Sequence, residues 1–455
     1  MKHSDLMKSH LNTIIEEFAS NKDQYVKNPG KDFTRDRKLP LEEVIKIVLS
    51  MEGGTLNKAL YEYFNNDPDR IVSASALVQQ RNKIKTELFM DLFYRFNEIT
   101  SQYDTKTYKG YRLYAVDGSD VNVAHDENAD TYMKPHKRRK DGEPAKGYNQ
   151  YHLNAAYDIL NKVYTNVTLA PRPTANERKE FVNILNDITL KDKTVFIADR
   201  GYFSWNMIAH VEHTDNADYL FRIPHSPKTL ATELPMTEFD IVKQLTITTK
   251  QTYRGKDGYI YVHKRKGTQK NRVYKEQLSE STKYQQWDFD AFETLNVRIV
   301  RFQLTNGTYE TIYTSLPQEQ FSLEDIKKLY GMRWGIETSF RELKYIIGLT
   351  NLHSKKDDFV RQEIYAKLTM YNFCERIIAA VEVEQKEDKK HSYQINYTMA
   401  MNICLDFFRC FDDYDFKVDE LIARYILPVR PGRADTRKDK IKGKTFVFFL
   451  YRVAA

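Results

Sequence analysis

The stretch KKLYGMRWGIETSFRELKYIIG (residues 327–348) decides how the rest of the chain is interpreted. Its polar residues of interest follow one another at offsets of 3, 4 and 7 positions: Tyr330, Arg333, Glu337 and Lys344. In a helix of about 3.6 residues per turn, these offsets place the four side chains within roughly one-sixth of a turn. A phenol, a guanidinium, a carboxylate and an amine on one face predict a site that binds a metal ion and a phosphate side by side.

The same stretch has the features of a single packed helix. Ser322 and Asp325 form an S-x-x-D capping pattern at its start. Apolar residues recur at helical spacing and predict a separate buried face: Ile326, Leu329, Ile336, Phe340 and Leu343. The alternative is a solvated face in which Arg333 and Glu337 form an ordinary i,i+4 ion pair.

A first carboxylate elsewhere in the chain favours the metal site. The segment YRLYAVDGSDVNV (111–123) is an apolar run broken by Asp117 and is typical of a buried strand. A carboxylate inside such a run is costly unless it is paired or binds a metal. Asp120 is the local competitor, and we prefer Asp117 because it directly follows the apolar core. A turn at Asp117-Gly118 remains the alternative.

A second carboxylate repeats the pattern. In KTVFIADRGYFSW (193–205), Asp199 ends a short apolar run and precedes a turn toward a helical segment. Polar residues at strand ends are common functional positions in α/β folds. A helix-capping role for Asp199 is the alternative.

Three carboxylates, two at strand ends and one on a helix, match the ligand set of two-metal phosphoryl transfer. Two divalent ions about 3.5–4 Å apart activate the attacking oxygen and stabilise the leaving oxygen. Oxygen ligands favour Mg²⁺ or Mn²⁺ over zinc. We therefore expect two Mg²⁺ ions, for which Mn²⁺ can substitute, at Asp117, Asp199 and Glu337.

With these residues the chain resembles the DDE transposases of bacterial insertion sequences. Within them it is most similar to the subgroup with a Tyr-x2-Arg-x3-Glu-x6-Lys signature, and the segments YAVDGS and ADRGY are also similar to the family. The resemblance covers residues from about 110 to about 350. It implies that Asp117, Asp199 and Glu337 are catalytic metal ligands, and that Tyr330, Arg333 and Lys344 bind DNA phosphates. It also implies double-stranded DNA as the partner and a homodimer in a synaptic complex.

The resemblance implies an α/β fold with a ribonuclease-H-like catalytic core. The sequence after Asp117 can be laid on that core as strands at 151–160, 162–170, 193–199 and 218–223, a helix at 174–188 with Thr174 and Glu177 as capping box, and a helix from about 204. Residues from about 226 to about 318 are rich in β-branched and aromatic residues and predict a mostly β insertion.

Helical patterns before and after this core predict three domains. We expect an N-terminal helical DNA-binding domain at 1–105, the catalytic domain at 106–350, and a C-terminal helical domain with a basic tail at 351–455. In the N-terminal domain, a long helical segment runs over 76–99. The resemblance assigns transposon-end binding to the first domain, and protomer pairing with further DNA contacts to the last.

Composition limits the class of protein and the compartment in which we expect it. The chain has 455 residues, 41% of them hydrophobic, which predicts a folded protein with a substantial core. A net charge of +7 permits nucleic-acid binding without establishing it. The three cysteines form no C-x-x-C pair and indicate a reducing compartment, and the N-terminal residues do not resemble a signal peptide. We therefore expect a protein of the bacterial cytoplasm or nucleoid, with no membrane partner.

Candidate DNA contacts lie outside the carboxylate set. Arg81 and Lys83 belong to a segment, SASALVQQRNKIK, that could be a recognition helix or an ordinary helix. Arg138 and Arg139 lie in a basic run. Trp287 and Tyr309 are candidates for stacking on a flipped base, with a core or loop role as the alternative: both fall in the β insertion.

The sequence thus predicts a transposase that cuts insertion-sequence ends by metal-dependent hydrolysis and joins the 3′-hydroxyl to target DNA. The resembled subgroup adds a hairpin intermediate. Two rival hypotheses stay open: an inactive or domesticated DNA-binding regulator, and a metal-dependent endonuclease without strand transfer.

Overall fold

The computed structural model describes residues 2–35, 37–65, 67–134, 147–225, 230, 234–264, 286–304, 307–385, 391–410 and 415–429. The chain forms two compact units. The helical unit consists of Met1–Thr105, Val121–Tyr151 and Ser339–Ala455. The sheet unit consists of Lys106–Asp120 and His152–Thr338, and it contains the two predicted aspartates and the predicted glutamate.

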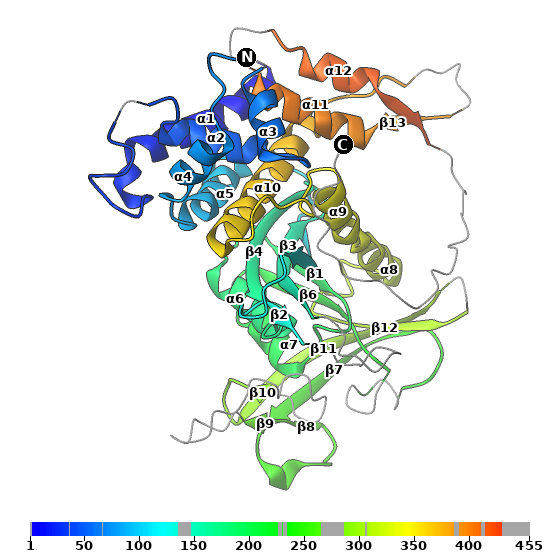
Figure 1. The fold of residues 1–455 in the computed structure, drawn as a ribbon. Helices are drawn as coiled ribbons and strands as arrows, with labels where there is room; N and C mark the ends of the chain where they lie inside the picture. Colours follow the sequence, from blue (N-terminus) through cyan, green and yellow to red (C-terminus); the bar gives the residue numbers. More distant parts are fainter. Residues whose placement is uncertain are drawn as a thin grey trace, which may run out of the picture. The chain divides into compact units, whose positions relative to one another are not determined.

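The helical unit is built around one buried helix. Its helices are α1 (His3–Ser20), α2 (Leu41–Ser50), α3 (Leu56–Tyr63), α4 (Ala74–Arg81), α5 (Glu87–Thr100), α10 (Asp357–Ile378), α11 (Tyr397–Arg409) and α12 (Val418–Arg424). Residues on every side of α10 are buried, and it packs against α1, α2, α5 and α11 (Figure 1). A helix covered all round forms the centre of a core and does not lie on its surface. Residues from both ends of the chain therefore share this core.

The long helix predicted over 76–99 is in fact two helices. The chain leaves α4 after Arg81 and enters α5 at Glu87. Between them Ile84 is buried and forms an isolated β-bridge with Val26. Backbone pairing with this distant segment replaces the helical hydrogen bonds, which a local pattern of apolar residues cannot reveal.

The main sheet is mixed. Its strands are β1 (Arg112–Val123), β2 (Tyr132–Met133), β3 (Tyr148–Asp158), β4 (Val163–Pro171), β5 (Thr194–Ala198), β6 (Ala217–Arg222), β7 (Phe239–Thr248), β8 (Tyr259–Tyr261), β11 (Phe292–Gln303) and β12 (Tyr309–Thr314). The order is β2-β3-β1-β5-β6-β12-β11-β7-β8, with β4 beside β3. β1, β5 and β6 are parallel neighbours, and all five residues of β5 are buried, as parallel central strands require. The strands and helices predicted from 111 to 223 are thus present, in the predicted chain order.

Side chains of the central strands alternate between two apolar clusters. Tyr114, Phe196 and Phe221 belong to the cluster that contains residues of α6 (Glu177–Asp187) and α7 (Trp205–Glu212). Leu113, Val195 and Leu220 belong to the other cluster, which contains residues of α8 (Leu323–Met332). The sheet therefore has an α6/α7 face and an α8 face.

The described residues between β6 and α8 are mainly strands. β7, β11 and β12 extend the sheet beyond β6, as the green to yellow arrows of Figure 1 show. β9 (His263–Lys264) and β10 (Gln286–Trp287) form a separate pair, and β13 (Tyr393–Ile395) and β14 (Ile426–Pro428) form another in the helical unit. Short 3₁₀ turns complete the elements: η1 (Lys22–Gln24), η2 (Ser101–Tyr103) and η4 (Gln251–Tyr253).

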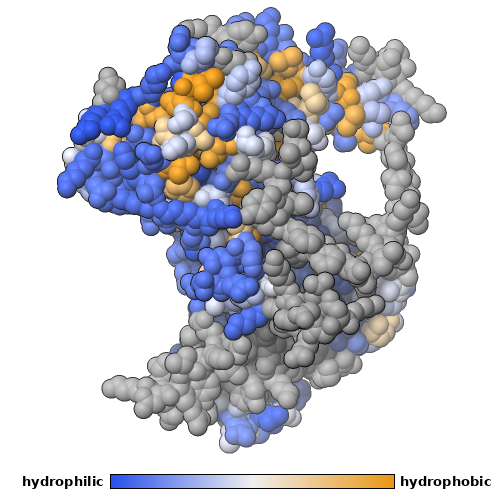
Figure 2. Space-filling view, viewed as in Figure 1, coloured by the Kyte–Doolittle hydropathy of each residue, from blue (hydrophilic) through white to orange (hydrophobic). Residues whose placement is uncertain are grey.

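The surface carries a mixture of residue types. On the face shown in Figure 2, apolar residues gather over helices of the helical unit, and hydrophilic residues cover most of the remaining described surface. Among the helices that the structure describes, none combines the length and the apolar character needed to cross a bilayer.

Candidate active site

Two of the predicted carboxylates lie side by side, just beyond the last paired residues of β1 and β5. Asp199 directly follows β5, but Asp117 lies in the middle of β1, which continues to Val123 and does not end at Asp117 as predicted. Val116 of β1 pairs with Ala198 of β5, so Asp117 and Asp199 occupy the next row of the sheet. Strand alternation places both on the α8 face, because Leu113 and Val195 belong to the α8 cluster. The carboxyl ends of parallel strands are the usual position of a binding site in such sheets.

Each aspartate is oriented by the backbone of a nearby glycine. The N–H of Gly118 donates to Asp117 Oδ1 at 2.8 Å, and the N–H of Gly201 donates to Asp199 Oδ1 at 2.7 Å. These bonds fix one oxygen of each carboxylate. The other oxygen of each remains available to a different partner.

Asp117 lies within electrostatic reach of the other two carboxylates. Burial first, and then the negative charges of Asp199 and Glu337, raise its pKa to about 6. The N–H of Gly118 and the guanidinium of Arg333 act in the opposite direction. The three predicted ligands therefore share one electrostatic environment, as a cation site requires.

Glu337 is presented by two helices, not by the single helix predicted from the sequence. α8 ends at Met332 and α9 (Trp334–Tyr345) begins after Arg333. At this junction Arg333 N and Ile336 N donate to carbonyls three residues earlier, which tightens the chain locally. The predicted start is confirmed, because Ser322 and Asp325 form a complete capping box.

A glycine lets α9 approach the sheet. A Cβ on Gly335 would lie 3.3 Å from Ile159 Cγ2 and 3.9 Å from the ring of Tyr157. A larger residue would need α9 to move outward, and Glu337 would move with it.

Arg333 connects the helix junction to the carboxylates. Its Nη2 donates to Glu337 Oε1 at 2.8 Å, and its Nη1 lies 3.5 Å from Asp117 Oδ2. The side chain is only 8% exposed, and its Nε is buried with no hydrogen-bond partner among the described residues. A buried cation with a spare donor is suited to receiving an anionic oxygen.

Tyr330 lies beside Arg333 on the α8 face. The Arg333 guanidinium is 5.8 Å from the Tyr330 ring centre, and burial raises the pKa of the Tyr330 phenol. Its hydroxyl forms a hydrogen bond with Arg222, which also pairs with Glu310 at 2.8 Å. Lys344 is half-buried in α9, two turns beyond Glu337.

Two residues near this site were missed by the sequence interpretation. Ala198 pairs with Phe221, so Arg222 occupies the same row as Asp199 and Asp117. Its position after the apolar run of β6, like that of Asp199 after β5, was the available signal. Trp334 is 53% exposed although it adjoins the buried Arg333, whose guanidinium lies 5.9 Å from its ring. No sequence signal separated it from core aromatics.

The donor set suits a hard divalent cation, because it consists of carboxylate oxygens. In the metal-free arrangement Arg333 is paired with two of the three carboxylates. Within the described residues, no three His, Cys, Asp or Glu side chains are clustered tightly enough to hold an ion.

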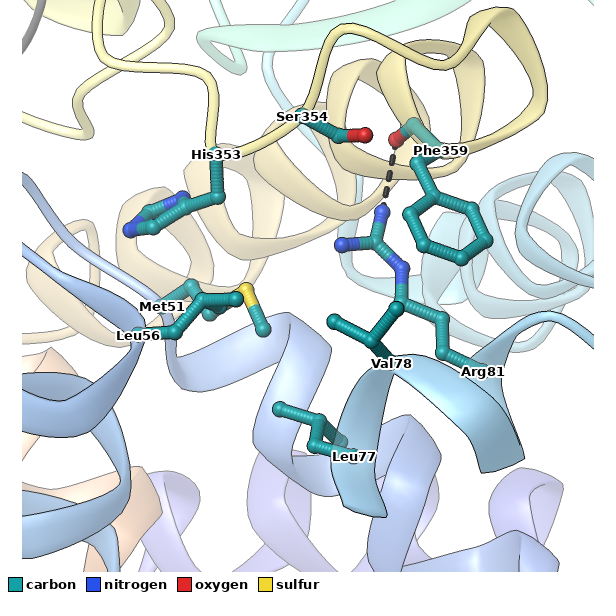
Figure 3. A pocket seen from close by; sticks show the side chains of 8 residues that line it. All are labelled: Met51, Leu56, Leu77, Val78, Arg81, His353, Ser354 and Phe359. Atoms are coloured by element: carbon teal, nitrogen blue, oxygen red, sulfur yellow. Dashed lines mark hydrogen bonds between the residues drawn. The ribbon is translucent and has the colours of Figure 1, made fainter. Parts of the chain in front are cut away.

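Arg81 is a correction to the predicted DNA contacts. Its side chain is 2% exposed and lies within the helical unit. It donates to Glu363 Oε1 at 2.8 Å, to Gln362 Oε1 at 2.8 Å and to the Phe359 carbonyl at 2.6 Å (Figure 3). Figure 3 shows the guanidinium at the edge of a small pocket lined by residues such as Met51 and His353. Arg81 is therefore a core residue and does not face DNA.

Trp287 is a second correction. It is 1% exposed, and its Nε1 donates to the Asp290 carbonyl at 2.7 Å, so its ring is not available to a flipped base. Lys83 is half-buried and donates to Gln80 Oε1 at 2.8 Å. Tyr309 is half-buried at the start of β12. Arg138 and Arg139, like the basic tail, lie outside the described residues.

Comparisons with known proteins give short and distant matches. The chain is 35% identical over 57 residues to the transposase for insertion sequence element IS421 of Escherichia coli, and equally to InsL, assigned as transposase to element IS186A of strain K12. Each match spans 12% of this chain and only 15% of the relative. A cryo-EM structure of the piggyBac transposase synaptic complex with hairpin DNA is similar with a TM-score of 0.42 and 9% identity, over 96% of this chain and 88% of that one.

A family model gives the broader match. The model of the transposase DDE domain matches residues 108–373, which is more than half of the chain and includes Asp117, Asp199, α8 and α9. The chain therefore belongs to the DDE transposase family.

Proposed function

We propose that this protein cuts the ends of an insertion sequence by Mg²⁺-dependent phosphodiester hydrolysis and joins the freed 3′-hydroxyl to target DNA by transesterification. The observation that carries the proposal is the row formed by Asp117 of β1 and Asp199 directly after β5 on two adjacent parallel strands, with Glu337 electrostatically coupled to it. The strand order β4-β3-β1-β5-β6 supports a ribonuclease-H-like catalytic core, extended by strands after β6 and flanked by helical domains.

Asp117, Asp199 and Glu337 would hold two Mg²⁺ ions, with Mn²⁺ as a substitute. Such ions generate a nucleophile from water and stabilise the attacking and leaving oxygens of an in-line displacement. The protein supplies fixed geometry, because Gly118 and Gly201 orient the aspartates and α8 packs on the sheet that carries them. Rigid elements maintain such geometry better than loops.

Arg333 would exchange partners during the reaction. In the metal-free protein it neutralises Asp117 and Glu337. Once cations occupy the carboxylates, the guanidinium would turn to a nonbridging phosphate oxygen, with its unpaired Nε as the first donor. Tyr330, Arg222 and Lys344 would position neighbouring phosphates of double-stranded DNA. We propose a homodimer as the unit that pairs two DNA ends.

The test is strand cleavage by the purified full chain. The substrate is a duplex that contains one terminal repeat of the element and its flanking DNA. We expect a nick at the repeat boundary with Mg²⁺ or Mn²⁺ and none with a chelator. Glu337→Gln should abolish the nick and retain binding of the duplex. Asp192→Asn is the matched control, because Asp192 pairs with Arg112 far from the carboxylate row, and it should cut normally.

The products distinguish the proposal from its rivals. A covalent product with a supplied target duplex supports strand transfer, and a closed hairpin on a denaturing gel supports the hairpin route. Cleavage without any joined product identifies an endonuclease. Repeat-specific binding without a nick under any metal condition identifies a regulator and contradicts the proposed activity.

A further inference from the structure

A histidine and two further carboxylates lie directly beside the row formed by Asp117 and Asp199. His152 of β3 has a side chain that is only 3% exposed, and its Nδ1 donates to Asp120 Oδ1 at 2.8 Å. Arg172 Nε lies 3.0 Å from the same oxygen. Burial would raise the pKa of Asp120, but the hydrogen bonds from His152 and Arg172 outweigh it and lower the pKa. Asp120 is therefore an anion that fixes the Nδ1–H end of the ring.

The other end of the ring has no comparable partner. His152 Nε2 is buried without a hydrogen-bond partner among the described residues, and the nearest carboxylate oxygen is Glu177 Oε1 at 3.7 Å. A buried polar atom that lacks a hydrogen bond costs free energy. The fold keeps this unpaired nitrogen buried despite the cost, so stability alone does not explain the position of Nε2.

One consequence of the ring position concerns Gly118. A Cβ built on Gly118 would lie only 2.3 Å from His152 Nε2. Residue 118 must therefore be glycine as long as the imidazole occupies this place. Because the N–H of Gly118 donates to Asp117 Oδ1, the ring limits where that donor can lie.

Glu177 lies beside the glycine that orients the second aspartate, at ordinary contact distance and without the steric exclusion that His152 imposes on Gly118. A Cβ on Gly201 would lie 3.4 Å from Glu177 Oε2 and 3.0 Å from Asp199 Oδ1. The N–H of Gly201 donates to Asp199, and its carbonyl accepts from Arg178 Nε at 2.9 Å. Glu177 and Arg178 are the first residues of α6, whose N-cap is Asn176 and not the predicted Thr174. The first turn of α6 thus contacts the peptide that orients Asp199.

We propose that His152 and Glu177 form a positioning pair that holds Gly118 and Gly201, and through their N–H groups sets the carboxylate orientations of Asp117 and Asp199 for cation binding. The proposal rests on the proposed function, since it assigns the pair to the same site. The phenol of Tyr202 supports the placement: burial raises its pKa well above the usual range, and the charges of Glu177, Asp117 and Asp199 raise it further. These three carboxylates therefore lie within electrostatic reach of one buried group.

A purely space-filling ring would have different consequences. Removing such a ring would lower the stability of the fold, and cation affinity would fall only as a result of that lowered stability. A positioning ring would change cation affinity at constant stability, because groups that orient metal ligands contribute typically 10–100-fold to affinity or activity. Asparagine can reproduce the Nδ1–H contact with Asp120, whereas glutamine can reproduce the reach of Nε2. The two amides therefore test the two ends of the ring separately.

The experiment compares His152→Asn, His152→Gln and Glu177→Gln in the full chain. Mn²⁺ affinity is measured without DNA by electron paramagnetic resonance, thermal unfolding reports stability, and cleavage of the repeat duplex reports activity. We expect His152→Asn and Glu177→Gln to weaken Mn²⁺ binding and slow cleavage about tenfold or more at a nearly unchanged unfolding midpoint. His152→Gln should retain most of the Mn²⁺ affinity and most of the cleavage rate of the unaltered protein. His210→Asn is the matched control, because it breaks another histidine–carboxylate pair of the sheet unit, with Asp288, and should change neither.

Two results would overturn the positioning pair. One is Mn²⁺ affinity equal to that of the unaltered protein in both His152→Asn and Glu177→Gln. The other is a loss of affinity that merely follows a lowered unfolding midpoint. If the unaltered protein binds Mn²⁺ with the expected dependence on His152 but cuts no DNA, the proposed function fails and the positioning pair stands.

Discussion

Arg333 has a geometry that lysine cannot reproduce. Two of its nitrogens face different carboxylates, at 2.8 Å and 3.5 Å, while a third is buried with no hydrogen-bond partner in the described residues. A planar guanidinium can make such contacts together, whereas an ammonium is a single point charge. The charge is therefore less important at this position than the fork of donors.

We expect Arg333→Lys to reduce the single-turnover cleavage rate about 10²–10³-fold, which is typical for loss of a preorganised donor to transition-state charge. Mn²⁺ binding should persist, because the three carboxylates remain. Arg112→Lys is the control: Arg112 bridges Asp158 and Asp192 in the same unit, at the opposite end of β1. A lysine variant that cleaves at the normal rate would exclude a phosphate role for the guanidinium.

Asp117 gives cation binding a pH dependence. Burial first, then Asp199 and Glu337, raise its pKa to about 6 in the metal-free protein. Because this folded-state pKa lies above the unfolded value of about 4, the stability linked to Asp117 is fully present below about pH 4 and is lost as the pH rises through about 6. Cation binding needs the ionised form, so Mn²⁺ affinity should fall up to about tenfold per pH unit below about 6. Mn²⁺ titrations at several pH values test this, and equal affinity at about pH 5 and about pH 7 would contradict it.

At the scale of elements, α8 depends on its first turn. Ser322 Oγ accepts from the Asp325 N–H, and the Asp325 carboxylate accepts from the Ser322 N–H and from Lys109. The bond from Lys109 and a second from Tyr108, ahead of those from Ser322, hold the pKa of Asp325 far below its usual value. The capping box therefore anchors α8 to the segment that precedes β1, as well as closing the helix end.

Removing the cap should loosen the element that leads to Arg333. We expect Ser322→Ala to lower the free energy of unfolding by about 1 kcal/mol, measured by urea denaturation. Ser322→Asp keeps a side-chain acceptor and should lose less. If alanine destabilises no more than aspartate does, the cap contributes little to the fold.

The elements also show which features a sequence can predict. The apolar runs at β1 and β5 predicted both strands and placed Asp117 and Asp199 correctly at the end of their apolar cores, because alternation and burial are local properties. The break at Arg333 was not predicted although Gly331 and Gly335 flank it, because single glycines are tolerated inside helices. The N-cap of α6 is Asn176 and not the predicted Thr174 for a similar reason. Several residues there can cap a helix, and only the path of the chain determines which one does.

At the scale of the whole molecule, contacts between residues far apart in the chain determine the features that local sequence patterns did not predict. Arg81 looked like a surface cation because its neighbours are polar, yet it lies against α10, more than 270 positions away in the chain. Trp287 is similar, since the contacts that bury it come from the packing of the sheet unit. A pattern in one segment cannot reveal a partner in another. The residues whose burial depends on a distant partner were therefore the ones predicted incorrectly, while the strands that carry or precede Asp117 and Asp199 were predicted from local sequence.

The buried pair of Arg81 and Glu363 makes the helical unit sensitive to single substitutions. Burial alone would raise the pKa of Glu363, but Arg81 and His353 lower it to about 2. Because this value lies below that of an unfolded glutamate, the stabilisation is present above about pH 4.5 and is lost as the pH falls through about 2. At neutral pH both groups are charged, so removing one leaves the other buried without its counter-charge.

Arg81→Met should therefore reduce the free energy of unfolding by about 3–5 kcal/mol, the usual cost of leaving one buried charge unpaired. Arg81→Met combined with Glu363→Gln should recover part of this loss, because no unpaired charge remains. Arg95→Met is the matched control: Arg95 is 40% exposed and pairs with Glu98, and such pairs contribute less than about 1 kcal/mol. Urea unfolding of the unaltered protein, Arg81→Met, Glu363→Gln and the double variant forms a double-mutant cycle around the buried pair. Additive effects of the two substitutions would show that Arg81 and Glu363 do not stabilise each other.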